Sequence, residues 1–411
     1  MKFLLLSQYF WPEIGASQIR LAALSQQLQS VGHEVQVVTA MPHHLIGDVF
    51  PHYRRRFYME ESYQGATVRR SWVYAATGTG GRRLFNYLSF AATSLIPLLK
   101  SQRPDVVFVE SPPLFLGLSG SAYGSLRRVP FILHVADLWP ESVRELGVIS
   151  DGTVYRAAQN LERWLYRKAS YVSAPTQSIL NALSTAGVPA RKLLFFPNGV
   201  DTEFFFPRPK DTMLTKDLGL DDVDIFLYAG THGVAQGLDV ILDAAELLKG
   251  ERVAFLLVGD GHTKPRLIER AKKAGLRNVI FVDSKPLEQM PTYFSIATAS
   301  IVPLLKRELF KGARPSKILP SLASGVPVIF CGEGETADLL RLSGSGVSVE
   351  PENAARLADA VLELSRNSER RNNMAAKGRQ LTVERFSWNR IVNGFLDQLL
   401  RSAASDGEAS L

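Results

Sequence analysis

Cysteine is almost absent from this sequence. Cys331 is the single cysteine among 411 residues, so no disulfide framework can form within the chain. Disulfide-rich proteins belong to oxidising compartments, and a chain of this size without them is typical of a reducing one. We therefore expect a cytoplasmic protein.

Long apolar runs are also lacking. The run Phe3–Leu6 is too short for the apolar core of a signal peptide. The longest apolar stretch, Leu84–Leu99, contains Asn86, Ser89 and Pro97, and it falls short of the roughly 20 residues that a membrane-spanning helix needs. We expect no transmembrane segment.

Several common site motifs are missing as well. No Gly-x-Gly-x-x-Gly follows the first predicted strand, no Walker phosphate loop occurs, and the histidines show no metal-ligand spacing. Asp222-Val223-Asp224 has the Asp-x-Asp form of metal-dependent transferases, but such a pair is expected by chance in a chain of this length, and we expect a solvated turn there. The sequence predicts neither a bound metal nor an organic cofactor.

Charge is present but unevenly distributed. Residues 1–200 hold 20 Lys and Arg against 12 Asp and Glu, whereas residues 201–411 hold 27 against 28. The basic excess of the first half favours an anionic partner, such as a phosphorylated acceptor or a lipid surface. Nucleic acid is not expected, because no recognition fold or aromatic stacking pattern accompanies the charge.

The order of elements predicts two doubly wound α/β domains. In the first half we expect strands at 2–6, 34–39, 67–74, 105–109, 131–135 and 171–174, with a helix at 16–31. In the second half we expect strands at 225–228, 253–258, 279–282, 299–302 and 326–330, with helices at 238–248 and 264–273. The predicted domains are residues 1–203 and 204–386, with a C-terminal helix at about 387–403 packing back on the first domain and a disordered tail at 404–411.

Glycine-rich loops follow strands in both predicted domains. Gly15 precedes the first helix, where backbone N–H groups and the helix dipole favour a phosphate. Gly230–Gly237 and Gly259–Gly261 follow the first two strands of the second domain. Ligands of open α/β sheets bind at this sheet edge, so we expect a phosphorylated ligand held between the two domains. The alternative is that these glycines only permit tight turns.

Two further segments carry side chains suited to that ligand. In Gly312–Leu319, we expect Pro315, Ser316 and Lys317 in the first turn of a helix, and Arg314 with Lys317 as a cationic patch for a diphosphate; an ordinary solvated pair of charges is the alternative. In His134–Glu141, His134 and Asp137 end a strand and are expected to face the cleft, unless His134 is a structural core residue.

Taken in order, these segments resemble family 4 of the glycosyltransferases, also called group 1, which are retaining enzymes of the GT-B fold. The matching pieces are Pro12–Gly15, His134–Pro140, Pro197–Asp201, Gly230–Gly237, Val258–Gly261 and Pro315–Pro327. Asp137–Pro140 and Pro315–Lys317 look most like the bacterial surface-polysaccharide branch that includes fucosamine transferases.

The resemblance implies two Rossmann-like domains and a metal-independent transfer of a hexosyl or N-acetylhexosaminyl group. The donor would be a nucleotide sugar, foremost a UDP-sugar, and the acceptor a glycan or a polyprenyl-diphosphate-linked glycan. His134 would contact the donor sugar and form the catalytic set with Asp137. The donor-binding residues would be Gly15, Gly233, Gln236, Gly259, Arg314, Ser316 and Lys317.

The sequence departs from the family pattern where a pair of glutamates spaced eight apart is usual. Gly312 and Pro320 stand at those positions, and the second glutamate usually binds the donor ribose. Two alternatives follow: a non-catalytic GT-B subunit that scaffolds a partner transferase, and a nucleotide-sugar 2-epimerase of similar fold.

The apolar stretch 84–99 has cations at both ends, Arg82-Arg83 and Lys100, and Arg54–Arg56 lies upstream. This pattern predicts peripheral binding to the anionic inner face of the cytoplasmic membrane, where a lipid-linked acceptor would lie. The alternative is a buried helix packed on the sheet.

Overall fold

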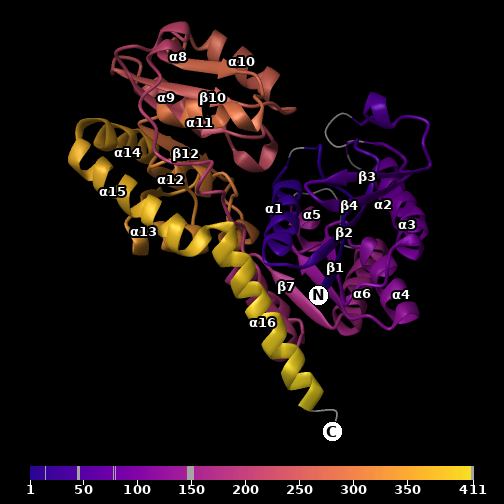
Figure 1. Ribbon diagram of the computed structural model, residues 1–411. Coiled ribbons are helices and arrows are strands. Elements are labelled where there is room, and N and C mark those ends of the chain that lie inside the picture. Colours follow the sequence, from indigo (N-terminus) through magenta and orange to yellow (C-terminus); the bar gives the residue numbers. More distant parts are fainter. Residues whose placement is uncertain (14, 44–46, 77, 79, 146–151, 409–411) are drawn as a thin grey trace. The chain divides into compact units, whose positions relative to one another are not determined.

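The computed structural model describes residues 1–13, 15–43, 47–76, 78, 80–145 and 152–408. They form two compact units, one comprising Met1–Asn198 and Ile391–Leu411 and the other Gly199–Arg390 (Figure 1). The boundaries predicted at residues 203 and 386 remain predictions.

The first unit is built on an eight-stranded sheet with the order β3-β4-β2-β1-β5-β6-β7-β8, parallel except for β3. Its strands are β1 (Lys2–Leu6), β2 (Glu34–Ala40), β3 (Tyr58–Tyr63), β4 (Ala66–Ser71), β5 (Val106–Ser111), β6 (Phe131–Val135), β7 (Tyr171–Ala174) and β8 (Leu193–Phe195). Its helices are α1 (Ala16–Ser30), α2 (Gly81–Thr93), α3 (Leu95–Lys100), α4 (Leu116–Arg127), α5 (Glu141–Glu145), α6 (Thr153–Lys168) and α7 (Gln177–Thr185), with short turns η1 (Pro51–Tyr53) and η2 (Ala190–Lys192).

The second unit is built on a six-stranded parallel sheet with the order β11-β10-β9-β12-β13-β14. Its strands are β9 (Asp224–Ala229), β10 (Val253–Val258), β11 (Val279–Val282), β12 (Ala299–Pro303), β13 (Val328–Cys331) and β14 (Gly346–Val349). Its helices are α8 (Thr212–Asp217), α9 (Asp239–Leu247), α10 (Lys264–Lys273), α11 (Met290–Ser295), α12 (Ile318–Ala323), α13 (Glu335–Ser343), α14 (Ala354–Arg366) and α15 (Ser368–Leu381). The turns η3 (Val234–Gln236), η4 (Leu287–Gln289), η5 (Glu308–Gly312) and η6 (Thr382–Phe386) complete it.

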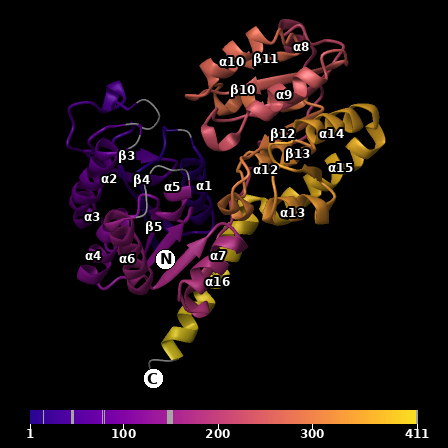
Figure 2. The same ribbon diagram turned by 180° about the vertical axis from the view of Figure 1, so that it is seen from behind.

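The central strands are continuous apolar runs because helices cover both faces of a parallel sheet. All six residues of β10 are buried, as are four of the five residues of β1. Helices lie on both faces of each sheet in two views turned by 180° (Figure 2). Each unit therefore has its own apolar core, and loops at the carboxyl edge of its sheet are free to hold polar groups.

The C-terminal helix α16 (Trp388–Glu408) packs in the first unit from Ile391 onward. The Phe395 ring lies 4.7 Å from that of Phe196 between centroids. Gln398 accepts a hydrogen bond from the Phe195 N–H and donates one to its carbonyl. The helix continues to Glu408, so residues 404–408 are helical where the sequence analysis expected a disordered tail; the remaining tail residues, 409–411, lie outside the described residues.

Candidate functional site

The strand order of the second sheet fixes where its polar loops meet. β9 lies between β10 and β12. From β9 the chain continues to β10 on one side, and from β12 it continues to β13 on the other side. A crevice outside the carboxyl ends of two such strands is the usual ligand site of doubly wound folds. The glycine-rich loop 230–237 follows β9, and the segment 312–317 follows β12.

The loops after β9 and β10 are joined backbone to backbone. The Gly230 N–H donates to the Val258 carbonyl at 2.9 Å, and the His232 N–H donates to the Asp260 carbonyl at 2.8 Å. A Cβ atom at Gly259 would lie 1.9 Å from the Gly230 carbonyl oxygen. Gly259 is therefore required for this close approach, which is a structural role independent of the donor contact expected from the resemblance.

Lys317 lies against the β9 loop. Its ammonium nitrogen donates to the Tyr228 hydroxyl oxygen at 2.9 Å and lies 4.4 Å from the centroid of that ring. The Tyr228 hydroxyl in turn donates to the Thr231 carbonyl at 2.6 Å. Lys317 caps the N-terminus of α12, which begins at Ile318. The sequence analysis expected Pro315, Ser316 and Lys317 in the first turn of this helix, but they precede it.

The electrostatics of Lys317 are unusual. Burial lowers the pKa of its ammonium group to about 7, and among the described residues it has no carboxylate partner. A Cβ atom at Gly230, whose φ is 147°, would lie 2.9 Å from the Lys317 Cε atom. The glycine thus leaves the space in which the lysine lies. An added anion would favour the charged lysine by Coulomb attraction.

The neighbouring His232 does not add a charge to the site. Its ring is fully buried, and burial together with the nearby Lys264 lowers its pKa to about 4. The imidazole is therefore neutral at pH 7.

The other predicted donor-binding residues of this unit lie in the same loops. Gly233 precedes η3, and Gln236 closes that turn; a Cβ atom at Gly233 would lie 2.7 Å from the Gln236 side-chain oxygen. Ser316 is exposed beside Lys317. Their contacts with a donor remain predictions.

Arg314 is placed differently from Lys317. Its guanidinium forms an ion pair with Glu335 at 2.5 Å, in the first turn of α13, and lies 5.2 Å from the Phe386 ring centroid. Only 7% of its side chain is exposed. The Nη2 atom of the guanidinium is thus paired with a carboxylate within the fold, whereas its buried Nε and Nη1 atoms have no hydrogen-bond partner among the described residues. A shared diphosphate contact of Arg314 and Lys317 remains a prediction.

Two residues of this region escaped the sequence analysis. Tyr228 was read only as a strand residue, although a tyrosine immediately before Ala229-Gly230 is a polar group at the ligand edge. Lys264 was read only as a helix residue; its ammonium group donates to the Gly259 and Val282 carbonyls and to Asp283. It thereby ties the ends of β10 and β11 beneath the Gly259 loop.

In the first unit, the corresponding change of direction lies between β1 and β5. Gly15 caps the N-terminus of α1 in the loop that follows β1; Ile14 of that loop lies outside the described residues. The Gln18 side chain, 3% exposed, lies close enough to Gly15 that a Cβ atom there would be 2.5 Å from its oxygen. A phosphate contact at this helix end remains a prediction.

His134 does not occupy an exposed position. It is the fourth residue of β6 and fully buried, with its ring stacked 5.4 Å from that of Phe108 and hydrogen-bonded to Ser173 at 2.9 Å. Burial, followed by the positive charge of Arg20, lowers its pKa well below the usual value. The imidazole thus lies within the core, but its Nε2 atom has no hydrogen-bond partner among the described residues. A contact of His134 with the donor sugar remains a prediction.

Asp137 lies just beyond β6 and is exposed. Desolvation by surrounding protein raises the pKa of its carboxyl group, against hydrogen bonds from the Ser142 side chain and the Leu138 N–H. Asp137 therefore has an exposed side chain just beyond β6, whereas His134, near the carboxyl end of the same strand, is buried. Their catalytic roles remain predictions.

The remaining candidates lie elsewhere. Asp224 starts β9, at the opposite end from the glycine-rich loop, and accepts hydrogen bonds from Thr298 and Ser365. Within the described part of the chain, no group of three or more His, Cys, Asp or Glu side chains could hold a metal. Pro320 lies within α12, and Gly312 ends η5.

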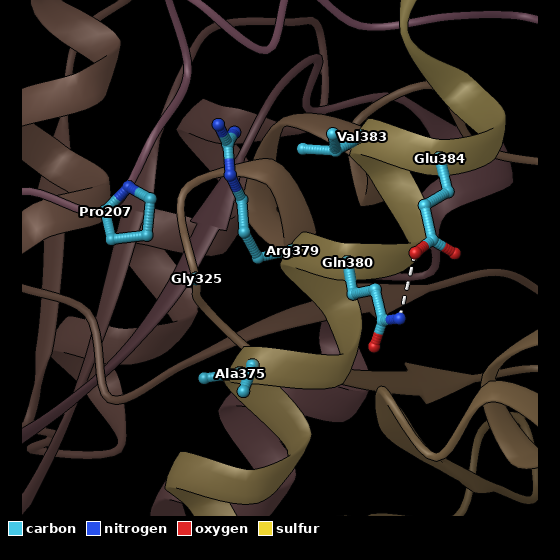
Figure 3. A pocket seen from close by; sticks show the side chains of 8 residues that line it. Pro207, Gly325, Ala375, Arg379, Gln380, Val383 and Glu384 are labelled. Atoms are coloured by element: carbon cyan, nitrogen blue, oxygen red, sulfur yellow. Dashed lines mark hydrogen bonds between the residues drawn. The ribbon is translucent and has the colours of Figure 1, made fainter.

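A pocket of about 480 Å³ lies on α15 of the second unit (Figure 3). Its lining includes Pro207, Gly325, Arg379 and Val383. Arg379 is engaged with the carbonyls of Phe205, Ala323 and Thr202. None of the lining residues belongs to the glycine-rich loops or to segment 312–317, so we do not assign the donor to this pocket.

Comparison with known proteins agrees with this arrangement. Residues 15–199 match the family described as Glycosyl transferase 4-like domain, and residues 212–381 match Glycosyl transferases group 1. WcaI from Escherichia coli K12, which is named as a glycosyl transferase of colanic acid biosynthesis, is 30% identical over 374 residues, covering 88% of this chain and 91% of WcaI. WbjE from Pseudomonas aeruginosa, named as a glycosyltransferase, is 25% identical over 66% of this chain and 69% of its own.

Solved structures share the fold over nearly the whole chain. Anabaena Alr3699/HepE in complex with UDP-glucose has a TM-score of 0.74 at 17% identity and covers 98% of this chain and 100% of its own. Sucrose-phosphate synthase from Thermosynechococcus elongatus has a TM-score of 0.75 at 18% identity and covers 98% and 99%. The two units form the GT-B fold expected from the sequence. The chain belongs to the group 1 glycosyltransferases.

Proposed function

We propose that this glycosyltransferase moves a hexosyl or N-acetylhexosaminyl group, with retention of configuration and without a metal, from a nucleotide-diphosphate sugar to a glycan or a polyprenyl-diphosphate-linked acceptor. The product would enter a bacterial cell-surface polysaccharide. The name of WcaI supports the pathway. The UDP-glucose complex of a protein with the same fold supports a UDP-sugar as donor.

One observation carries the proposal. Lys317 is a partly buried lysine at the carboxyl edge of the sheet, beside glycine-rich backbone, with no carboxylate partner among the described residues. Burying a cation without an anion is costly, and a donor diphosphate would supply one. Gly233, Gln236, Gly259 and Ser316 would line the donor around it. In the first unit, taken by itself, the backbone N–H groups at Gly15 would bind a phosphate at the start of α1.

The chemistry of this proposal needs positioning and charge more than a side-chain nucleophile. The acceptor hydroxyl oxygen would form the new bond to the anomeric carbon on the face from which the diphosphate leaves. The bond between that carbon and the phosphate oxygen breaks, and the departing phosphate takes the acceptor proton. Lys317 would stabilise the charge that grows on the diphosphate, which is the kind of interaction that accelerates the step.

A donor screen tests the proposal. Purified protein is heated with UDP-glucose, UDP-N-acetylglucosamine or GDP-mannose, and a bound donor raises the midpoint of unfolding by mass action. We expect one donor to raise it, and to be slowly hydrolysed in EDTA with the released sugar first appearing in the donor's anomeric configuration. Binding without hydrolysis would favour the non-catalytic subunit, and hydrolysis that requires an added divalent ion would contradict the metal-independent mechanism.

A further inference from the structure

The helices α2 and α3 expose a row of apolar side chains, which we call the apolar stripe: Leu84, Phe85, Leu88, Ala92, Leu95, Ile96 and Leu99. Phe85 is 53% exposed and Leu99 is 49% exposed. Exposed apolar residues are unremarkable when scattered, but a contiguous set marks an interaction surface.

The stripe is contiguous because α2 and α3 form one nearly continuous helix. Ser94 joins them in a helical conformation, its N–H donating to the Phe90 carbonyl and its carbonyl accepting from the Leu98 N–H. At about 100° per residue, the seven side chains fall within an arc of about 120°. Both views show α2, α3 and α4 together on one flank of the first unit (Figures 1 and 2).

The inward face of α2 explains why these residues stay outside. Asn86 is fully buried and bonded to the Gln8 side chain and to the Tyr74 carbonyl. The Ser89 hydroxyl accepts from the Tyr74 N–H. Rotating α2 to bury the apolar stripe would break these bonds. The hydrogen bonds of Asn86 and Ser89 therefore keep the apolar face of the helix turned outward.

Two aromatic side chains extend the apolar surface. Phe57 and Trp72 stack with ring centroids 6.5 Å apart and are 55% and 38% exposed. The Trp72 carbonyl accepts a hydrogen bond from Thr93, at the end of α2. The aromatic pair therefore lies beside the helix that carries the stripe, and exposed tryptophan is enriched at membrane interfaces.

The charged residues within the segment that carries the stripe have a single sign. Residues 81–104 contain Arg82, Arg83, Lys100 and Arg103 and no Asp or Glu. Arg82 is exposed and has no polar partner among the described residues, and Lys100 lies 4.1 Å from the Tyr58 ring centroid. Cations at both ends of one helical row would oppose a second copy packing antiparallel on the same stripe, whereas they complement an anionic surface.

We propose that the apolar stripe is a peripheral membrane contact that binds an anionic phospholipid surface, with Phe85 and Leu88 in the acyl boundary and Arg82 and Lys100 at the headgroups. Among the described residues no helix is long and apolar enough to cross a membrane. Interfacial helices bind by apolar burial together with attraction to anionic lipids. That the surface would also carry the acceptor rests on the proposed function; the contact itself does not.

Vesicle flotation with the full chain tests the contact. The vesicles are phosphatidylcholine alone, or phosphatidylcholine with phosphatidylglycerol, at low and at high salt. We expect flotation only with the anionic vesicles, and loss of binding as salt shortens the range of the attraction. Equal binding to both vesicle types, or binding to neither, would overturn the proposal.

Matched substitutions locate the contact. Phe85→Ser/Leu88→Ser should weaken anionic-vesicle binding at least tenfold, while Leu247→Ser/Leu342→Ser, at exposed apolar positions of the second unit, should leave it unchanged. Arg82→Gln/Lys100→Gln should weaken it by roughly fivefold for each cation removed, while Arg277→Gln/Arg356→Gln should not. Equal losses in the control variants would overturn the assignment to this stripe.

Two further measurements, the oligomeric state and donor hydrolysis, distinguish the membrane contact from an interface between copies and from the proposed function. If the free protein is a dimer that Phe85→Ser/Leu88→Ser dissociates, the stripe is an interface between copies and the proposal fails. Donor hydrolysis in solution should be unchanged by the stripe substitutions. A wild-type protein that floats but hydrolyses no donor would contradict the proposed function and leave the membrane contact standing.

Discussion

The Lys317 ammonium nitrogen lies 2.9 Å from the Tyr228 hydroxyl oxygen, although 89 residues separate the two in sequence. Tyr228 lies near the carboxyl end of β9, and Lys317 follows β12. The pair therefore joins two neighbouring strands at the carboxyl edge of the sheet. The same hydroxyl donates to the Thr231 carbonyl in the glycine-rich loop. Tyr228 thus acts as a positioning residue, which orients both the lysine and the loop backbone.

Tyr228→Phe tests that role. The substitution keeps the ring but removes both hydrogen bonds, each of which contributes about 0.5–1.5 kcal/mol. We expect the KM for the donor to rise roughly 3–10-fold, with a smaller change in kcat. Steady-state kinetics measure the split. Tyr293→Phe, at another buried tyrosine of the second unit, is the control, and an equal effect there would show that the change is merely structural.

The lowered pKa of Lys317 predicts a pH dependence of donor binding. The free protein loses the lysine proton near pH 7, whereas the donor diphosphate requires the charged form. Binding therefore takes up a proton above pH 7, and the Kd for UDP-glucose should rise about tenfold per pH unit there, until the pKa of the complex is passed. Titration calorimetry between pH 6 and 9 measures it.

Lys317→Gln supplies the comparison for this titration. Its donor affinity should be weaker than that of the wild type at pH 6 and nearly constant across the range. A slope in Lys317→Gln like that of the wild type would assign the titration to another group.

Gly230→Ala tests the space in which the lysine lies. The φ of 147° is strained for a side chain, and the new Cβ would lie 2.9 Å from the Lys317 Cε atom. We expect donor affinity to fall at least tenfold, measured as the concentration dependence of the thermal shift. Gly250→Ala, where a Cβ atom would have no neighbour within 4 Å, should bind normally; a Gly230→Ala protein that also binds normally would contradict the assigned geometry.

Arg314 should contribute to stability more than to turnover. Arg314→Ala removes one member of a largely buried ion pair, Arg314 with Glu335, and breaking such a pair costs about 3–5 kcal/mol in the free energy of unfolding. Urea denaturation measures it. Arg314→Ala/Glu335→Ala should recover part of the loss. A stable Arg314→Ala protein with a turnover defect as large as that of Lys317→Ala would contradict this prediction and support a direct contact of Arg314 with the diphosphate.

The sequence predicted the buried parallel strands well because their apolar runs leave little choice. The strands at residues 2–6, 131–135 and 253–258 have the predicted limits. β3 (Tyr58–Tyr63) was missed because it is a polar edge strand, of sequence YMEESY, that pairs antiparallel with β4. Edge strands have no second neighbour to bury them, so their sequences carry a weaker signal.

The site was less predictable because its side chains are fixed by partners distant in sequence. Lys317 was found from its local motif, but its partner Tyr228 was not. Arg314 was grouped with Lys317 because they are three residues apart in sequence. The carboxylate that pairs with Arg314 belongs to Glu335, which is 21 residues away in sequence. His134 lies near the end of its strand as expected, and it was expected to face the cleft. The side chains of a strand alternate between its two faces, and the face that carries His134 is covered by Phe108 and Phe196.

The central claim is that Lys317 holds the donor diphosphate and stabilises the charge that grows on it. The most direct measurement is the turnover of donor by Lys317→Ala beside the wild type, at saturating donor, with circular dichroism to establish that both are folded. A charge-assisted hydrogen bond is worth about 1.5–3 kcal/mol and more as charge develops, so the account predicts that turnover falls about 100-fold or more. A folded Lys317→Ala protein with near-normal turnover would contradict it.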